Sequence, residues 1–159
     1  MARLAAAFGM SVTGARRTPD GTEGFPVHRL DEFDALLPEA DWIVLALPLV
    51  DSTTHIFSTA RMARCRRGAR VINIGRGGLI DEPALIDALR SGVVGGAALD
   101  VFATEPLPAE SPLWELPGVI ITPHSSAAVP STRHRQAVAF IENLALYESG
   151  ASLRNEVLP

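Results

Sequence analysis

Residues 70–101 read RVINIGRGGLIDEPALIDALRSGVVGGAALDV, and this stretch decides the fold class. It begins with the apolar strand candidate Arg70–Ile74 and ends with a second candidate, Gly96–Val101. Between them, Asp81 is a favourable helix N-cap residue, and Gly92 is a favourable helix end. A strand, a helix and a strand in this order predict a parallel βαβ unit.

The same alternation continues on both sides of this unit. Three more strand candidates are the apolar runs Ser11–Ala15, Trp42–Leu47 and Val119–Thr122. Trp42–Leu47 is apolar throughout, which predicts a strand buried on both faces. The longest helical stretch, Thr132–Ser149, follows the last strand. We therefore expect an α/β three-layer sandwich, in which helices cover a parallel sheet of about five strands.

The first residues, Met1–Phe8, read as a helix that leads into the strand candidate at Ser11–Ala15. In a dinucleotide-binding fold, such a helix follows a first strand and the glycine-rich turn that binds the pyrophosphate. No G-x-G-x-x-G motif occurs in the 159 residues. We expect residues 1–150 to form a Rossmann-type NAD(P)-binding domain without its first strand and glycine-rich turn. We expect residues 151–159 to return to a substrate domain that the chain does not contain.

The composition narrows the classes of partner. A formal net charge of −4 and scattered arginines argue against binding to nucleic acid. The single cysteine, Cys65, cannot form an internal disulfide, and we expect no metal site. The apolar runs are too short to cross a membrane, and no secretory signal opens the chain, so we expect a cytoplasmic protein.

Polar side chains follow three of the predicted strands. Arg76 lies between glycines, and its guanidinium could bind a carboxylate through two charge-assisted hydrogen bonds. Asp100 ends one strand and Glu105 lies in the proline-rich loop after it, while His124 follows the last strand. Because ligands bind at the carboxyl ends of strands in open parallel sheets, these positions predict a functional site.

Each of these residues has an ordinary structural explanation when it is taken alone. A lone His124 is more often a structural or surface histidine, by about three to one. Glu105 could be a solvated loop charge, and Arg76 could bind a helix C-terminus. These explanations are poor as a joint account of three polar residues in one order after successive strands.

Two segments resemble the signature of the D-isomer-specific 2-hydroxyacid dehydrogenases. They are INIGRGGLIDEPALIDALRSGVVGGAALDVFATEPLP at residues 72–108 and SPLWELPGVIITPHSSA at residues 111–127. The resemblance implies hydride transfer between NAD(P)H and a 2-keto acid or D-2-hydroxy acid of glyoxylate or hydroxypyruvate type. It also implies that the full-length protein is a homodimer.

The resemblance implies a role for each polar residue. Arg76 would bind the substrate carboxylate, and His124 would give a proton to the C2 oxygen. Glu105 would orient the imidazole and keep a protonated acid available, and Asp100 would lie near the nicotinamide carboxamide. The other positions that normally touch the cofactor are Pro48, Thr54, Ile74 and Ser126.

The end of the first strand candidate bears on the choice of cofactor. A carboxylate at this point selects NAD, whereas arginine accommodates the 2′-phosphate of NADP. Residues 13–19 read TGARRTP, with no acid, and they contain Arg16 and Arg17. We therefore expect NADP to be preferred over NAD.

Two alternatives remain open from the sequence. One is a non-catalytic, nucleotide-sensitive binding module, as in the C-terminal-binding-protein corepressors, which have this fold. The other is an inactive fragment, because the chain has no pyrophosphate turn and no substrate segment to exclude water from the cleft. For the isolated polypeptide we expect little or no turnover.

Overall fold

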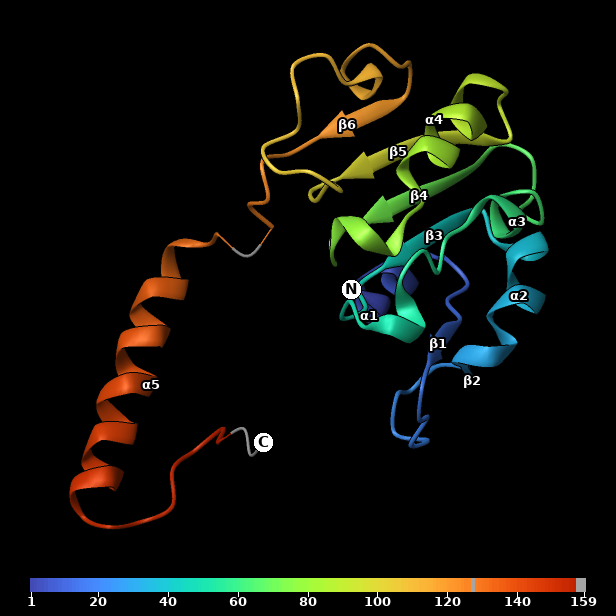
Figure 1. Ribbon diagram of the computed structural model, residues 1–159. Helices are drawn as coiled ribbons and strands as arrows, with labels where there is room; N and C mark the ends of the chain where they lie inside the picture. Colours follow the sequence, from blue (N-terminus) through green and yellow to red (C-terminus); the bar gives the residue numbers. More distant parts are fainter. Residues whose placement is uncertain (127, 157–159) are drawn as a thin grey trace. The chain divides into compact units, whose positions relative to one another are not determined.

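The computed structural model describes residues 1–126 and 128–156 (Figure 1). The chain divides into two compact units, Met1–Pro123 and His124–Pro159. The division comes earlier than the domain limit predicted at residue 150, which stays a prediction.

The first unit alternates strands with short helices. Its strands are β1 (Gly14–Arg16), β2 (Val27–Arg29), β3 (Trp42–Leu45), β4 (Ala69–Asn73), β5 (Val94–Leu99) and β6 (Val119–Ile121). Its α-helices are α1 (Ala2–Ala7), α2 (Phe33–Leu36), α3 (Thr59–Met62) and α4 (Glu82–Arg90). Its 3-10 turns are η1 (Leu30–Glu32), η2 (Leu37–Glu39), η3 (Asp51–Thr53), η4 (Gly77–Leu79) and η5 (Pro112–Trp114).

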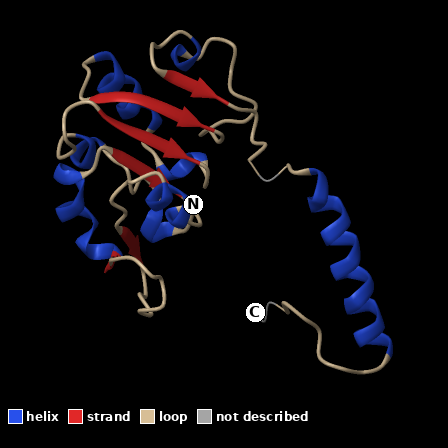
Figure 2. Cartoon of the chain, turned by 180° about the vertical axis from the view of Figure 1, so that it is seen from behind, coloured by secondary structure: helices blue, strands red, loops and turns tan. Residues whose placement is uncertain are grey.

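Strands β3, β4, β5 and β6 form a parallel sheet in that order (Figure 2). Their register places Val44 beside Ile72, Ile72 beside Ala98, and Ala98 beside Ile120. Helix α4 connects β4 to β5, and its N-cap is Asp81, whose carboxylate accepts the Ala84 N–H at 3.3 Å. The predicted βαβ unit and the α/β class with a parallel sheet are confirmed.

The expectation of one sheet of about five strands is wrong. Strands β1 and β2 form a separate parallel pair, which lies beyond the β3 edge of the larger sheet (Figures 1 and 2). A strand that crosses over through α1 to β1 would lie next to β1 in the sheet. Among the described residues no strand occupies that position, and β1 is not hydrogen-bonded to β3. Strand β2 is not predicted from the sequence, because its three residues after Pro26 are too short a run to indicate a strand.

The core of the first unit lies on one face of the four-stranded sheet. Ile43, Leu45 and Val71 point into it and pack against apolar side chains of α2, α3 and α4. On the other face, Trp42 is 44% exposed and Val44 is 39% exposed. The prediction that Trp42–Leu47 is buried on both faces is therefore wrong, because helices of the first unit cover only one side of β3.

The second unit contains the helix α5 (Pro130–Glu148) and the segment after it. Asn143 and Arg154 exchange two hydrogen bonds, from Arg154 N–H to Asn143 Oδ1 at 2.8 Å and from Asn143 Nδ2 to the Arg154 carbonyl at 3.1 Å. Arg154 also pairs with Glu142 at 2.6 Å. These contacts return the chain onto α5. Among the described residues, no helix is long and apolar enough to cross a membrane.

Candidate functional site

A depression of about 540 Å³ lies where β3 and β4 end. Its volume falls within the range of about 300–1,000 Å³ that is usual for small-molecule sites. Its lining residues come from the two loops that follow these strands: Ala46, Leu47, Pro48, Leu49, Ile74, Gly75 and Arg76. Three residues predicted for the site, Pro48, Ile74 and Arg76, therefore lie together.

The loop that carries Arg76 is held by a buried amide. The Asn73 side chain is 1% exposed, and it accepts the Gly75 N–H at 3.1 Å and donates to the Arg76 carbonyl at 3.0 Å. The guanidinium of Arg76 is exposed and donates through Nη1 to the Gly75 carbonyl at 2.7 Å. No other hydrogen bond of this side chain occurs within the described residues, which leaves its remaining donors for a ligand.

Two glycines let this loop pack closely against its neighbours. A Cβ at Gly75 would lie 2.9 Å from the carbonyl oxygen of Leu47. A Cβ at Gly77 would lie 1.9 Å from the carbonyl group of Phe102. The glycines around Arg76 therefore bring its loop into contact with the loops that follow β3 and β5.

The loop after β5 carries Asp100 and Glu105. The Asp100 side chain is 4% exposed and accepts a hydrogen bond from the Thr122 hydroxyl at the end of β6. Glu105 accepts the Phe102 N–H through Oε1 at 3.0 Å. Since Phe102 also abuts Gly77, the first unit brings the Arg76 loop and the Glu105 loop together.

Thr54 lies in the turn after β3. Its hydroxyl donates to the Val50 carbonyl at 3.1 Å, and its side chain is exposed. Its neighbour Thr53 is buried, donates to the Pro48 carbonyl at 2.8 Å, and accepts the Val50 N–H at 2.9 Å. Thr53 therefore fixes the turn in which both Pro48 and Thr54 lie.

His124 and Ser126 belong to the second unit, and both are exposed. His124 has a φ of 50°, in the left-handed region that few non-glycine residues adopt. Such strain occurs often at functional sites. It does not distinguish His124 from His55, which has a φ of 49° and belongs to no polar motif.

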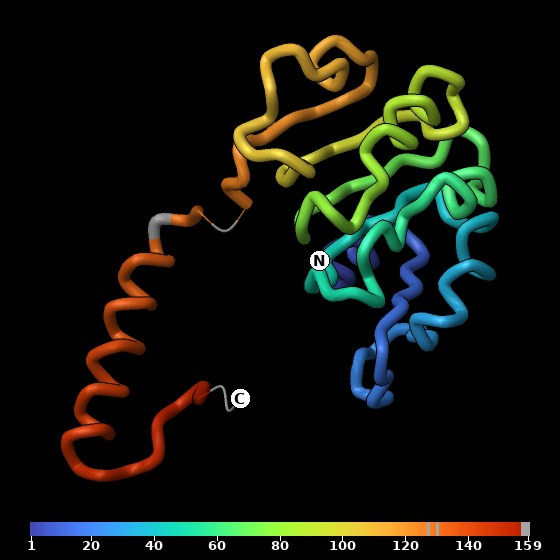
Figure 3. Tube along the Cα trace, in the orientation of Figure 1, coloured from blue at the N-terminus to red at the C-terminus, as the bar shows by residue number. Residues whose placement is uncertain are grey.

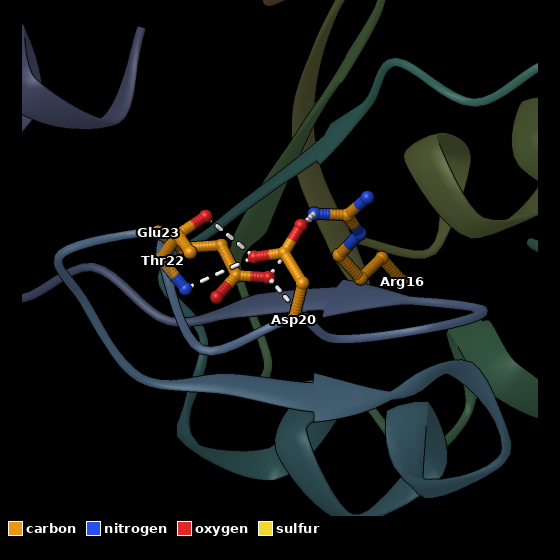
Figure 4. Close-up of polar contacts among 4 residues, drawn as sticks. All are labelled: Arg16, Asp20, Thr22 and Glu23. Carbon is orange, nitrogen blue, oxygen red and sulfur yellow. Dashed lines mark hydrogen bonds and ion pairs between the residues drawn. The ribbon is translucent and has the colours of Figure 1, made fainter.

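Arg16 ends β1 (Figure 4), and Arg17 follows it in the sequence. Arg16 Nη1 lies 3.1 Å from Asp20 Oδ2 and 3.1 Å from Glu23 Oε1. Arg17 is exposed, and no hydrogen bond or ion pair of its side chain occurs in the part of the chain that the structure describes. Asp20 and Glu23, which follow the segment 13–19, thus contact Arg16, one of the two arginines predicted to bind the cofactor.

Local contacts and burial shift the pKa values of Asp20, Glu23 and Cys65. Hydrogen bonds from the Thr22 hydroxyl and backbone N–H lower the pKa of Asp20. A hydrogen bond from the Asp20 backbone N–H lowers the pKa of Glu23. Burial raises the pKa of the Cys65 thiol to about 11. Within the described residues there is no group of three or more His, Cys, Asp or Glu side chains that could hold a metal ion.

The family described as D-isomer specific 2-hydroxyacid dehydrogenase, NAD binding domain, matches residues 1–126. The chain belongs to this family. Membership confirms the resemblance predicted from residues 72–108 and 111–127, and it confirms the Rossmann-type fold.

Individual relatives agree with this assignment. The chain is 43% identical over 154 residues to glyoxylate/hydroxypyruvate reductase B of Serratia proteamaculans (strain 568), an alignment that covers 96% of this chain and 47% of the relative. It thus spans about half the length of the curated relatives that it matches.

Two solved structures with a bound nucleotide are also similar. A D-isomer specific 2-hydroxyacid dehydrogenase from Xanthobacter autotrophicus Py2, in complex with NADPH and MES, has a TM-score of 0.85 and 42% identity, and the match covers 97% of this chain and 63% of that one. An NADPH-dependent glyoxylate/hydroxypyruvate reductase from Sinorhizobium meliloti, in complex with NADP and sulfate, has a TM-score of 0.88 and 38% identity, with 98% and 50% covered.

The described residues fit a nicotinamide dinucleotide at two places. The depression beside Gly75 has a volume of about 540 Å³, which is large enough to admit a ring of a small molecule. Arg16 and Arg17 supply guanidinium groups at the end of β1, where charge suits an anion. The glycine-rich turn for the pyrophosphate is not in the sequence.

Four residues that hold the candidate site residues in place are not among those predicted from the sequence. The motifs that predict the site assign no role to Asn73 or Thr53. Asp20 and Glu23 were missed because they lie outside the segment 13–19. A buried asparagine before a glycine is a usable signal, since its amide satisfies backbone groups in a turn. No comparable sequence pattern predicts that the loop brings Asp20 and Glu23 back to Arg16.

Proposed function

We propose that this chain carries the cofactor-binding and reacting groups of an NAD(P)-dependent dehydrogenase. The substrate would be a 2-keto acid or D-2-hydroxy acid of glyoxylate or hydroxypyruvate type, as the names of relatives indicate. The observation that carries the proposal is the exposed Arg76 guanidinium, held by Asn73 and Gly75 at the depression where β3 and β4 end.

Arg76 is proposed to bind the substrate carboxylate. A guanidinium matches a carboxylate through two parallel hydrogen bonds, which fixes the orientation of the C2 carbonyl. Because Asn73 and Gly75 already hold the loop, less conformational freedom is lost when the substrate binds. The positive charge of Arg76 would also stabilise the oxygen at C2 as negative charge develops on it.

His124 is proposed to donate the proton to that oxygen in reduction and to remove it in oxidation. Glu105 is proposed to orient the imidazole. Its tie to the Phe102 N–H keeps the carboxylate in a loop packed against the Arg76 loop. When bound, the reduced nicotinamide supplies the hydride. Asp100, Pro48, Thr54, Ile74 and Ser126 are the proposed cofactor contacts.

We further propose that NADP is preferred over NAD. Arg16 and Arg17 support this preference, and so do the similar structures that contain NADPH or NADP. The homodimer and the cytoplasmic location stay predictions. The corepressor-type alternative is not favoured, because the named relatives are reductases.

The test measures cofactor binding and glyoxylate-dependent oxidation of NADPH and NADH by the 159-residue chain. We expect NADP⁺ and NAD⁺ to bind weakly, because the sequence has no G-x-G-x-x-G turn. We expect any turnover to be slow and to disappear in His124→Ala. Binding of neither cofactor would overturn the proposal, and so would oxidation that Arg76→Gln and His124→Ala leave unchanged.

A further inference from the structure

The guanidinium of Arg16 contacts two carboxylates through a single nitrogen, Nη1. Asp20 and Glu23 both contact Nη1, and each contact is 3.1 Å long (Figure 4). Nε and Nη2 make no hydrogen bond within the described residues, so this edge of the guanidinium stays open. The two acids thus bind the arginine that the proposed function assigns to the 2′-phosphate of the cofactor.

The loop holds both carboxylates without help from Arg16. Asp20 Oδ1 accepts the Thr22 backbone N–H at 2.9 Å and the Thr22 hydroxyl at 2.6 Å. Glu23 Oε1 accepts the Asp20 backbone N–H at 3.1 Å. Figure 3 shows this segment as a blue loop that extends from the unit between β1 and β2. Each acid is therefore held by hydrogen bonds of the loop in addition to its contact with the arginine.

The formal charges of the four charged residues at and after the end of β1 sum to zero. Arg16 and Arg17 contribute two positive charges, and Asp20 and Glu23 contribute two negative ones. The Glu23 side chain is only 12% exposed, against 48% for Arg16, so its charge is screened less by water. At the end of β1 the formal charges of the two acids thus offset those of the two arginines.

Resting on the proposed function, we infer that Asp20 and Glu23 reduce the selectivity for NADP over NAD by restraining Arg16 and offsetting its charge. A phosphate monoester carries about 1.5 to 2 negative charges at neutral pH and is repelled by both carboxylates. The 2′-hydroxyl of NAD is uncharged and can donate to a carboxylate. The acids therefore narrow the preference for NADP that the arginines alone would give.

The test uses substitutions that remove the negative charges of Asp20 and Glu23 and preserve the hydrogen bonds within the loop. In Asp20→Asn, Oδ1 can still accept from Thr22, while the new amide faces Arg16 in place of Oδ2. In Glu23→Gln, Oε1 can still accept the Asp20 N–H. The matched control is Asp31→Asn, which removes an exposed carboxylate paired with Arg29 at 3.3 Å outside this loop.

Calorimetry would measure dissociation constants for NADP⁺, NAD⁺, 2′,5′-ADP and 5′-AMP. We expect Asp20→Asn/Glu23→Gln to bind NADP⁺ and 2′,5′-ADP about three to ten times more tightly. NAD⁺ and 5′-AMP should change by less than about twofold, and Asp31→Asn should change none of the four. Adding Arg16→Gln to the double variant should abolish the gain.

The outcomes separate the inference from the proposed function. If the wild-type chain binds neither NAD⁺ nor NADP⁺, the proposed function fails and this inference fails with it. If it binds them but the double variant gains nothing for 2′,5′-ADP, the inference alone is wrong. An equal gain for 5′-AMP would also overturn it, because the effect would then not depend on the 2′-phosphate.

Discussion

The buried side chain of Asn73 donates to the backbone carbonyl of Arg76 at 3.0 Å, and it accepts the Gly75 N–H with its other end. One amide therefore satisfies two backbone groups in the turn that presents the guanidinium. A buried backbone group without such a partner would cost stability. Asn73 thus connects the end of β4 to the geometry of the proposed substrate site.

Asn73→Ala should destabilise the first unit by about 1–3 kcal/mol, because it leaves the Gly75 N–H and the Arg76 carbonyl without their partner. Urea unfolding followed by tryptophan fluorescence measures the loss. Asn143→Ala removes exposed hydrogen bonds in the second unit and is the matched control. An Asn73→Ala protein as stable as wild type would show that water or a shifted backbone replaces the amide.

Gly77→Ala should be far more damaging than the same change one residue later. Its Cβ would lie 1.9 Å from the Phe102 carbonyl, which is backbone and cannot turn aside. A Cβ at Gly78 would meet the end of the flexible Leu49 side chain at 3.0 Å. We expect a loss of at least about 2 kcal/mol for Gly77→Ala and under about 1 kcal/mol for Gly78→Ala in urea unfolding. Equal losses would contradict the close packing of the two loops.

The sequence predicts those parts of the fold that local patterns encode. Strands β3 to β6 lie where apolar runs predict them, because a strand in a parallel sheet reads as such a run. Asp81 caps α4 as predicted, since the cap depends only on residues within one turn. Arg76, Pro48 and Ile74 meet at one depression because parallel strands bring their carboxyl ends to the same edge.

The features that were missed depend on the rest of the molecule. Whether helices pack on one face of β3 or on both depends on other parts of the chain. The apolar sequence of β3 alone therefore predicted wrongly that Trp42 is buried. The Trp42 ring lies under the Arg70 guanidinium, with 5.1 Å between Arg70 Cζ and the ring centroid. This is the face of β3 on which Trp42 and Val44 are exposed. The approach of Asp20 and Glu23 to Arg16 depends on how a loop folds back, which residue types alone do not determine.

Cys65 should react slowly with thiol reagents while the chain is folded. Its pKa of about 11, against a usual 9.0, leaves about 100-fold less thiolate at neutral pH, and burial also blocks access. Labelling with iodoacetamide at pH 7.5, with and without urea, measures the difference. Because the pKa is raised, its contribution to stability is complete below pH 9 and is lost as the pH rises towards 11. Equally fast labelling of folded and unfolded protein would contradict this.

Acid should release the loop that holds Arg16. The pKa values of Asp20 and Glu23 are lowered below their usual 3.8 and 4.5, so folding favours the ionised carboxylates. Their contribution to stability is therefore present above about pH 4.5 and is lost as the pH falls through the lowered values. Exchange of the Thr22 amide hydrogen, measured by NMR, should show protection that decreases on acidification.

The matched comparison for this acid titration is Asp20→Asn. Its side-chain oxygen still accepts from Thr22 but does not titrate, so less of the protection of the Thr22 amide should depend on pH. In Asp31→Asn the acid-induced loss should equal that of wild type, because Asp31 lies outside the loop. If all three proteins lose protection at the same pH and to the same extent, the Asp20 carboxylate does not hold the loop. The hydrogen bonds of the turn would then hold the loop without the charge of Asp20, and both acids would stay beside Arg16 as the pH falls.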